Sequence, residues 1–192
     1  ELRAPASVLF DPGNGGVHGI ANEYIEGCCL AGSGLTPALA DKLLDGVAAD
    51  ILLANWDAPG LINDNLVLLP DGELVRIDNG GTFAYRAQGA LKPADMLERI
   101  DEWDIFTGKL PGISISTDSY VAATHAAGCL SLDAILPRIR DQVVKIGRFA
   151  DMTEDFEKLL PAFGWIDGAT RDAMYRMLRS RFSLLCVRAG II

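Results

Sequence analysis

The sequence feature that most constrains the fold is a tight turn between two short apolar runs in the first half of the chain. Residues 65–69 and 73–77 are rich in leucine, valine and isoleucine, and Pro70-Asp71-Gly72 separates them. Turn-forming residues between two such runs predict an antiparallel hairpin with a turn of the Asp-Gly type. Two earlier β-prone runs, residues 7–10 and 17–25, flank a glycine-rich turn and predict a second pair of strands.

A long amphipathic helix is predicted just before the hairpin. Thr36-Pro37 is typical of a helix start, with Thr36 as the N-cap and proline at the first helical position. Apolar residues then recur every three or four positions to about Ala54, which is the spacing of one helix face. The order of strands, helix and hairpin places a polar loop between this helix and the hairpin.

Beyond Lys92 the pattern becomes helical. Helices are expected over residues 94–100, 120–127, 132–149, 153–160 and 169–189. The apolar spacing predicts that the two longest bury one face each, made of Ile135, Ile139, Val143, Ile146, Met174, Leu178 and Phe182. The whole order predicts an α+β fold in which a helical layer packs on the earlier elements.

Composition and charge exclude several classes of function. The chain has 17 basic and 26 acidic side chains, a formal net charge of -9, and no cluster of lysine and arginine, so binding to nucleic acid is not expected. There is no run of about 18 apolar residues and no signal-peptide pattern at the start, so neither a membrane partner nor export is expected. We therefore expect a soluble, cytoplasmic protein.

The cysteines do not have the spacing of a metal site or a disulfide framework. Cys28 and Cys29 are adjacent, Cys129 and Cys186 are far apart, and no Cys-x-x-Cys pair occurs. Reduced, buried thiols are expected.

Three polar residues lie where this predicted arrangement would bring them together. Asp57 follows the long helix, Asn65 stands at the mouth of the hairpin, and Asp78 follows its second strand. Because hairpin strands return to the same end, Asn65 and Asp78 are expected side by side, with Asp57 one loop away. An amide oxygen and a carboxylate suit a hard cation such as Mg²⁺, and a further carboxylate can accept a proton from an attacking hydroxyl. This combination predicts phosphoryl transfer.

The layout resembles that of the protein-kinase-like superfamily. The runs Ala54-Asn55-Trp56-Asp57, Asp64-Asn65 and Ile77-Asp78-Asn79-Gly80-Gly81, followed by residues 83–89, are similar to its atypical branches. These branches are the actin-fragmin kinase, HipA-like and phosphoinositide-kinase-like proteins, together with a group of uncharacterised bacterial kinase-like proteins. The resemblance covers roughly residues 19–92 and implies a kinase-like C-lobe, mainly helical, with a short N-terminal strand pair and a catalytic β-hairpin.

The resemblance also implies roles for individual residues. Asp57 corresponds to the catalytic-loop aspartate that acts as base, and Asn65 and Asp78 correspond to the metal ligands. Residues 23–27 resemble the hinge between kinase lobes, which touches adenine through its backbone. The implied adenine-binding residues are Glu23, Tyr24, Ile25 and Glu26. The implied cofactors are ATP and Mg²⁺, and the implied segments are residues 1–34 (strands and hinge), 35–92 (catalytic-loop helix and metal-binding hairpin) and 93–192 (helical subdomain).

Three departures from the kinase pattern leave alternatives open. Asp57 and Asn65 are eight residues apart instead of the usual five, and Asn79 replaces the usual phenylalanine. The first lysine is Lys42, after the hinge-like segment, so the lysine that positions ATP is expected on a missing N-lobe segment or a partner chain. The alternatives to a kinase with an unknown protein or small-molecule acceptor are a non-catalytic pseudokinase-like module that binds a protein, and an enzyme that transfers AMP.

Overall fold

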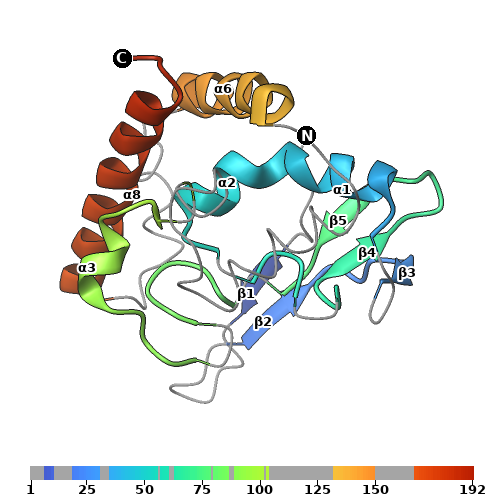
Figure 1. The fold of residues 1–192 in the computed structure, drawn as a ribbon. Helices are drawn as coiled ribbons and strands as arrows, with labels where there is room; N and C mark the ends of the chain where they lie inside the picture. Colours follow the sequence, from blue (N-terminus) through green and yellow to red (C-terminus); the bar gives the residue numbers. More distant parts are fainter. Residues whose placement is uncertain are drawn as a thin grey trace.

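The computed structural model has an α+β fold (Figure 1), and it describes residues 7–10, 19–30, 35–55, 57–60, 63–78, 80–86, 89–101, 103, 132–149 and 167–192. Its elements are β1 (Ser7–Phe10), β2 (Gly19–Asn22), β3 (Cys28–Cys29), α1 (Pro37–Leu43), the 3₁₀ turn η1 (Leu44–Gly46), α2 (Val47–Leu52), β4 (Leu66–Leu68), β5 (Leu74–Arg76), α3 (Ala94–Leu97), α6 (Leu132–Phe149) and α8 (Gly168–Arg188). Among the described helices, none has both the length and the apolar character required to cross a membrane.

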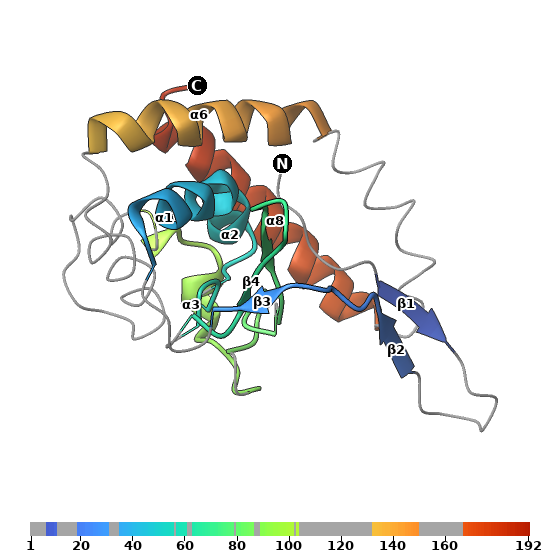
Figure 2. The same ribbon diagram turned by 90° about the vertical axis from the view of Figure 1, so that its right-hand side faces the viewer.

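The strands form two small antiparallel sheets. β1 pairs with β2, which confirms the predicted first pair, and β2 ends at Asn22, three residues before the expected end of the run. β3, β4 and β5 form a three-stranded sheet in that order, with Leu66 opposite Arg76 in the predicted hairpin. Figure 2 shows the β1–β2 pair on one side of the molecule, apart from the three-stranded sheet that carries the hairpin.

The hairpin loop lies at Pro70-Asp71-Gly72, as predicted, but its turn is not of the expected Asp-Gly type. The Gly72 N–H donates to the Leu69 carbonyl (2.9 Å) and the Leu69 N–H to the Glu73 carbonyl (2.8 Å), which defines a three-residue loop. Gly72 has a φ of +83°, the left-handed conformation that ends such a loop. Pro70 explains the difference, because its ring fixes φ at a negative value and favours an ordinary turn before the glycine.

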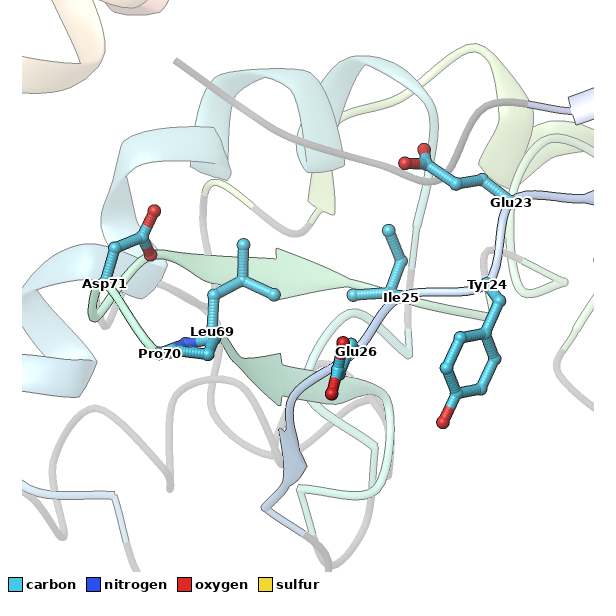
Figure 3. Close-up of a pocket in the computed structure, with 7 residues that line it drawn as sticks. All are labelled: Glu23, Tyr24, Ile25, Glu26, Leu69, Pro70 and Asp71. Atoms are coloured by element: carbon cyan, nitrogen blue, oxygen red, sulfur yellow. The ribbon is translucent and has the colours of Figure 1, made fainter.

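The hinge-like segment lies along the hairpin (Figure 3). Ile25 packs against a small cluster formed by Val67, Leu69 and Val75, together with Ile77. The backbone approach is close at Gly27, where an added Cβ would lie 2.6 Å from Val67 Cγ1 and 2.7 Å from the Leu68 carbonyl oxygen. A residue with a side chain at Gly27 would therefore push the segment away from the sheet.

The predicted long helix begins as expected but is not continuous. Thr36 is the N-cap, its hydroxyl oxygen accepts from the Leu39 N–H (3.3 Å), and Pro37 is the first helical residue. A 3₁₀ turn at Leu44–Gly46 then separates α1 from α2. The expectation of one helix to about Ala54 was therefore wrong at its centre, where Gly46 leaves helical geometry with a φ of -118° and a ψ of 5°.

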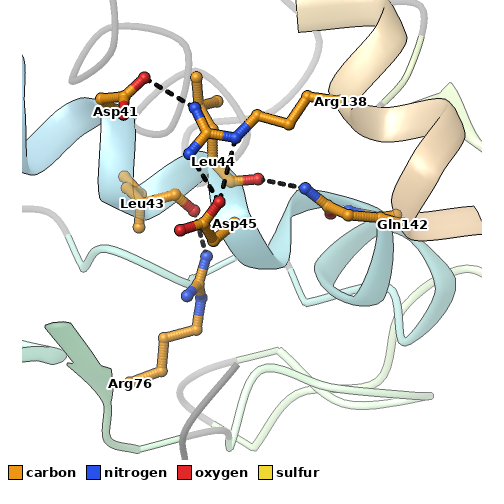
Figure 4. Close-up of polar contacts among 8 residues, drawn as sticks. Asp41, Leu43, Leu44, Asp45, Arg76, Arg138 and Gln142 are labelled. Carbon is orange, nitrogen blue, oxygen red and sulfur yellow. Dashed lines mark hydrogen bonds and ion pairs between the residues drawn. The ribbon is translucent and has the colours of Figure 1, made fainter. Parts of the chain in front are cut away.

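A side chain from α6 repairs this interruption. The Gln142 amide nitrogen donates to the Leu44 carbonyl (2.7 Å), and its amide oxygen accepts from the Ala48 N–H (3.0 Å). One turn away, Arg138 pairs with Asp41 (2.7 Å) and Asp45 (2.6 Å), so α6 is fixed across the break (Figure 4). The Leu44 carbonyl and the Ala48 N–H, which flank the break, thus pair with a side chain almost a hundred residues further along the chain.

The main core lies between α1–α2, the hairpin and the two long helices. α2 contacts both α6 and α8, which also contact each other. The predicted bounds of α6 are confirmed and those of α8 agree within one residue. The helices expected at 120–127 and 153–160 lie outside the described residues, and α3 is shorter than its expected 94–100.

The predicted buried face of the long helices is confirmed in part. Ile139, Val143 and Leu178 are buried, and Ile146 and Phe182 are partly buried against the core. Met174 is only half-buried because it lies early in α8, before the stripe of Met177, Leu178, Arg181, Leu185 and Cys186. The side chain of Ile135 lies outside the described residues.

The three thiols in the described residues are free but not all buried. Cys28 and Cys29 are exposed, so the expectation of buried thiols was wrong for both, while Cys186 is buried. The reason is that β3 is a two-residue strand at the edge of its sheet, paired only to β4 among the described strands. Burial raises the pKa of the Cys186 thiol. Cys129 lies outside the described residues.

Candidate functional site

The three residues singled out by the sequence lie around the open end of the hairpin. Asp57 is half-buried in the loop that follows α2, Asn65 is buried immediately before β4, and Asp78 is exposed two residues after β5. The Ile77 N–H donates to the Asn65 carbonyl (2.9 Å), so Ile77 stands opposite Asn65 and Asp78 is one residue beyond that pair.

Asn65 holds Asp57 directly. Its side-chain nitrogen donates to the Asp57 main-chain carbonyl (2.7 Å) and to the Asp57 carboxylate oxygen Oδ2 (3.2 Å). Asp57 and Asn65, which are eight positions apart, are therefore the first and last residues of a loop and are hydrogen-bonded to each other. Because the amide nitrogen serves Asp57, the amide oxygen is the atom that Asn65 can offer to a cation.

Three carboxylates gather at this end, and we call Asp57, Asp64 and Asp78 the acidic cluster. The pKa of Asp57 is raised, mainly by burial and further by the negative charges of Asp64 and Asp78, although the hydrogen bond from Asn65 lowers it. Like charges held this close disfavour one another's ionised forms, and a cation would relieve that repulsion. Among the described residues, no three His, Cys, Asp or Glu side chains are arranged to hold a metal, so any cation here would need Asn65 or ligand oxygens as well.

Asn55 connects the loop to a buried ion pair beneath it. Its side-chain oxygen accepts from the Asp57 N–H (3.3 Å), its side-chain nitrogen donates to Asp50 Oδ1 (3.4 Å), and its main-chain N–H donates to the Asp50 carbonyl (2.8 Å). Asp50 pairs with Arg76 (3.0 Å), and Arg76 also donates to the Leu43 carbonyl. Burial raises the pKa of Asp50, against the opposing effects of the Arg76 charge and its hydrogen bond.

The backbone around the site is strained. Ala54, Asn63, Asp78 and Phe83 are the non-glycine residues of the described chain with positive φ, between 51° and 61°. Left-handed backbone is unfavourable for residues with a Cβ and gathers at functional sites. Here all four positions fall between α2 and the segment after β5, which surround the acidic cluster.

Gly60 is the most crowded of the described glycines in this region. It has a φ of +74°, and an added Cβ would lie 2.0 Å from an Asp64 carboxylate oxygen. Gly60→Ala is therefore expected to lower the free energy of unfolding by about 1–2 kcal/mol for the left-handed backbone. A smaller further loss is expected from crowding, because the exposed Asp64 carboxylate can turn aside whereas the Asn65 main-chain nitrogen, 3.2 Å from the added Cβ, cannot. Urea unfolding measures both effects together.

Gly89→Ala is the matched control for this prediction. Gly89 has a φ of +79°, but an added Cβ would meet nothing within 4 Å, so only the backbone effect should appear. Equal losses in the two variants would show that Asp64 does not close over Gly60.

The predicted hinge residues line a separate pocket at the other end of the hairpin. Glu23, Tyr24, Ile25 and Glu26 border a cavity of about 380 Å³ together with Leu69, Pro70 and Asp71 (Figure 3). The Tyr24 side chain is 88% exposed, and three carboxylates lie around the cavity. Asp57, Asn65 and Asp78 do not border this pocket.

The sequence reasoning missed the residues that support the site from inside. Asp50 and Arg76 are charged residues within apolar helix and strand patterns, and that interruption is the signal that could have found them. Lys92 is 5% exposed and Arg181 is fully buried, and both donate to main-chain carbonyls at the end of α2 or just beyond it. The expected packing role of Trp103 is confirmed, because that side chain is buried in the core.

Comparison with protein-family models, curated proteins and solved structures finds no match for this chain. Inference about its function therefore depends on the site itself.

Proposed function

We propose that this chain is the hinge and C-lobe of a kinase-like phosphotransferase that uses Mg-ATP. Asp57 is the base, Asn65 and Asp78 are the metal ligands, and residues 23–26 contact the nucleobase. The observation that carries the proposal is the contact of Asn65 with Asp57 at the open end of the hairpin, within reach of the charges of Asp64 and Asp78.

The residues present fit a magnesium ion. Mg²⁺ prefers oxygen ligands, keeps several waters, and is commonly bound by one or two carboxylates together with substrate phosphates. In this proposal the exposed Asp78 carboxylate and the amide oxygen of Asn65, whose nitrogen serves Asp57, are the two protein ligands. When bound, the ion would neutralise charge on the phosphates.

Asp57 is suited to accept a proton. Its raised pKa brings it closer to neutral pH, where a base takes up a proton more readily, and the Asn65 amide orients one of its carboxylate oxygens. In the proposed reaction the acceptor hydroxyl oxygen bonds to the γ-phosphorus, the bond to the bridging oxygen of ADP breaks, and the hydroxyl proton passes to Asp57.

In this proposal the two ends of the hairpin bind different parts of the nucleotide. From Asn65 to Leu69 the strand covers roughly 13 Å, which is comparable with the extent of a nucleoside triphosphate. The carboxylates around the pocket repel phosphates, so the neutral base belongs at that end and the phosphates at the end with the metal ligands. Because both ends are acidic, nucleotide binding should depend fully on the divalent cation.

A non-catalytic module that binds a protein is the second candidate. It is favoured by Lys92, whose ammonium is engaged by three main-chain carbonyls instead of pointing at a nucleotide. In the first proposal the phosphate-binding lysine comes from an N-lobe segment or a partner chain, because Lys42, the first lysine of the sequence, follows the hinge-like segment.

Calorimetry with Mg-ATP separates the two candidates. The 192-residue chain alone is expected to bind Mg-ATP weakly, and the protein expressed from its complete gene is expected to bind it tightly. Asp78→Ala should weaken the tight binding at least tenfold, and so should EDTA. Asp141→Ala, which removes an exposed carboxylate on α6, is the matched control and should leave the affinity for Mg-ATP unchanged.

Two results would contradict the kinase proposal. The first is tight binding that survives both EDTA and Asp78→Ala, because the nucleotide would then lie elsewhere. The second is a complete protein that binds no nucleotide, which favours the non-catalytic module.

A further inference from the structure

Lys92 is a buried lysine whose side chain reaches the candidate site. It is 5% exposed, and its Nζ donates to the main-chain carbonyls of Ala54 (2.8 Å), Gly81 (2.6 Å) and Phe83 (2.8 Å). An ammonium group carries three N–H donors, so it can serve all three carbonyls at once.

The three carbonyls belong to the two segments that carry the site. Ala54 lies three residues before Asp57, whereas Gly81 and Phe83 lie three and five residues after Asp78. The segments also touch directly, since the Phe83 N–H donates to the Leu53 carbonyl (2.7 Å). An added Cβ on Gly81 would lie 3.1 Å from the Cβ of Asp57.

The backbone at two of these carbonyls requires support. Ala54 and Phe83 both have a φ of 52° and are therefore in the left-handed region that residues with a Cβ avoid. Charge-assisted hydrogen bonds are stronger than neutral ones, and those from Lys92 offset the strain at both positions.

We propose that Lys92 is a positioning residue that joins the Asp57 loop and the Asp78 turn into one site. Its ammonium occupies the point where the carbonyls of both segments converge, as a small cation would. That Lys92 joins the two segments follows from its three hydrogen bonds. That it thereby supports metal binding rests on the proposed function.

Arg181 provides a matched comparison. It is also a fully buried cation, and it also donates to main-chain carbonyls, those of Ile51, Leu52 and Arg99. Ile51 and Leu52 lie at the end of α2, and Arg99 lies beyond Lys92, so these carbonyls do not include those of Gly81 and Phe83 in the turn that follows Asp78. Loss of either cation should destabilise the protein, but only loss of Lys92 should separate the two site segments.

The test follows the NMR signals of the Asn65 side-chain amide, which report its bonds to Asp57, and those of the Phe83 main-chain amide. We expect both to shift in Lys92→Gln, which keeps a polar side chain of similar length but loses the charge and one donor. They should stay in place in Arg181→Gln at an equal folded fraction. Mn²⁺ binding, read from paramagnetic broadening, should weaken at least tenfold in Lys92→Gln alone.

Chemical rescue gives an independent readout. In Lys92→Ala, ethylammonium should restore the wild-type Asn65 and Phe83 signals, because it brings N–H donors to the vacated carbonyls. Tetramethylammonium has the same charge and no N–H, and it should restore nothing. Failure of Lys92→Ala to fold without ethylammonium, with folding restored by it, is also an expected result.

Two outcomes would overturn the proposal. One is a folded Lys92→Gln in which the Asn65 and Phe83 signals do not move. The other is a rescue by tetramethylammonium equal to that by ethylammonium, since the rescue would then not depend on N–H donation to the carbonyls. If the wild-type protein binds no Mn²⁺, the magnesium site of the proposed function fails, whereas the NMR signals still decide the role of Lys92.

Discussion

Asp50→Ala is expected to lower the free energy of unfolding by about 3–5 kcal/mol, because it leaves the buried Arg76 guanidinium without its carboxylate. Both side chains are almost completely buried, so water cannot replace the lost partner. The substitution also removes the Asp50 oxygen that accepts from the Asn55 side chain, and Asn55 in turn accepts from the Asp57 N–H. The loss should therefore appear both in stability and in the position of the Asp57 loop.

Urea unfolding with two further variants tests this prediction. The double variant Asp50→Leu/Arg76→Met removes both charges and should be more stable than Asp50→Ala, because an apolar pair carries no desolvated charge. Asp45→Ala breaks the exposed pair with Arg138 and should cost only about 0–1 kcal/mol. A double variant that is less stable than Asp50→Ala would mean that the pair stabilises the fold by itself.

Asp57→Asn is expected to reduce phosphoryl transfer by about 10²–10⁴-fold while slightly stabilising the fold. The rate falls because an amide cannot accept the hydroxyl proton, and general bases contribute about that factor. The stability rises because the variant removes a half-buried charge that Asp64 and Asp78 repel. We expect a gain of only about 0.5 kcal/mol at neutral pH, since solvent screens a partly exposed carboxylate.

The pH dependence gives this prediction a definite sign. The folded-state pKa of Asp57 lies above its ordinary value of 3.8, so its contribution favours folding below that value and is lost as the pH rises through the folded-state pKa. Asp57→Asn has no such titration. Its advantage in stability should therefore grow from acid to neutral pH, as followed by thermal unfolding at several pH values.

Asp141→Asn is the control for both parts of this prediction. It removes one negative charge from an exposed position on α6 and should change neither the rate nor the pH dependence. A stability gain in Asp57→Asn that is largest at acid pH would contradict the repulsion within the acidic cluster. An unchanged rate of transfer would remove Asp57 from the role of base.

The local parts of the fold could be predicted from the sequence because their causes are local. Thr36 and Pro37 define a helix start through bonds within four residues, and the apolar runs on either side of Pro70–Gly72 define a hairpin. The hairpin then brings Asn65 and the residues after β5 to one end. For that reason the neighbourhood of the candidate site could be inferred from pattern alone, although the type of turn could not.

Only the tertiary structure decided what holds that neighbourhood in place. Gln142 reaches Leu44 and Ala48 across more than ninety residues, Arg181 reaches Ile51 across 130, and Lys92 joins Ala54 to Gly81. The physical reason is that strained or interrupted backbone leaves polar groups inside the protein, and each must find a partner wherever the fold supplies one. Periodicity in the sequence records which residues are buried, but it contains no information on which distant side chain satisfies a given carbonyl.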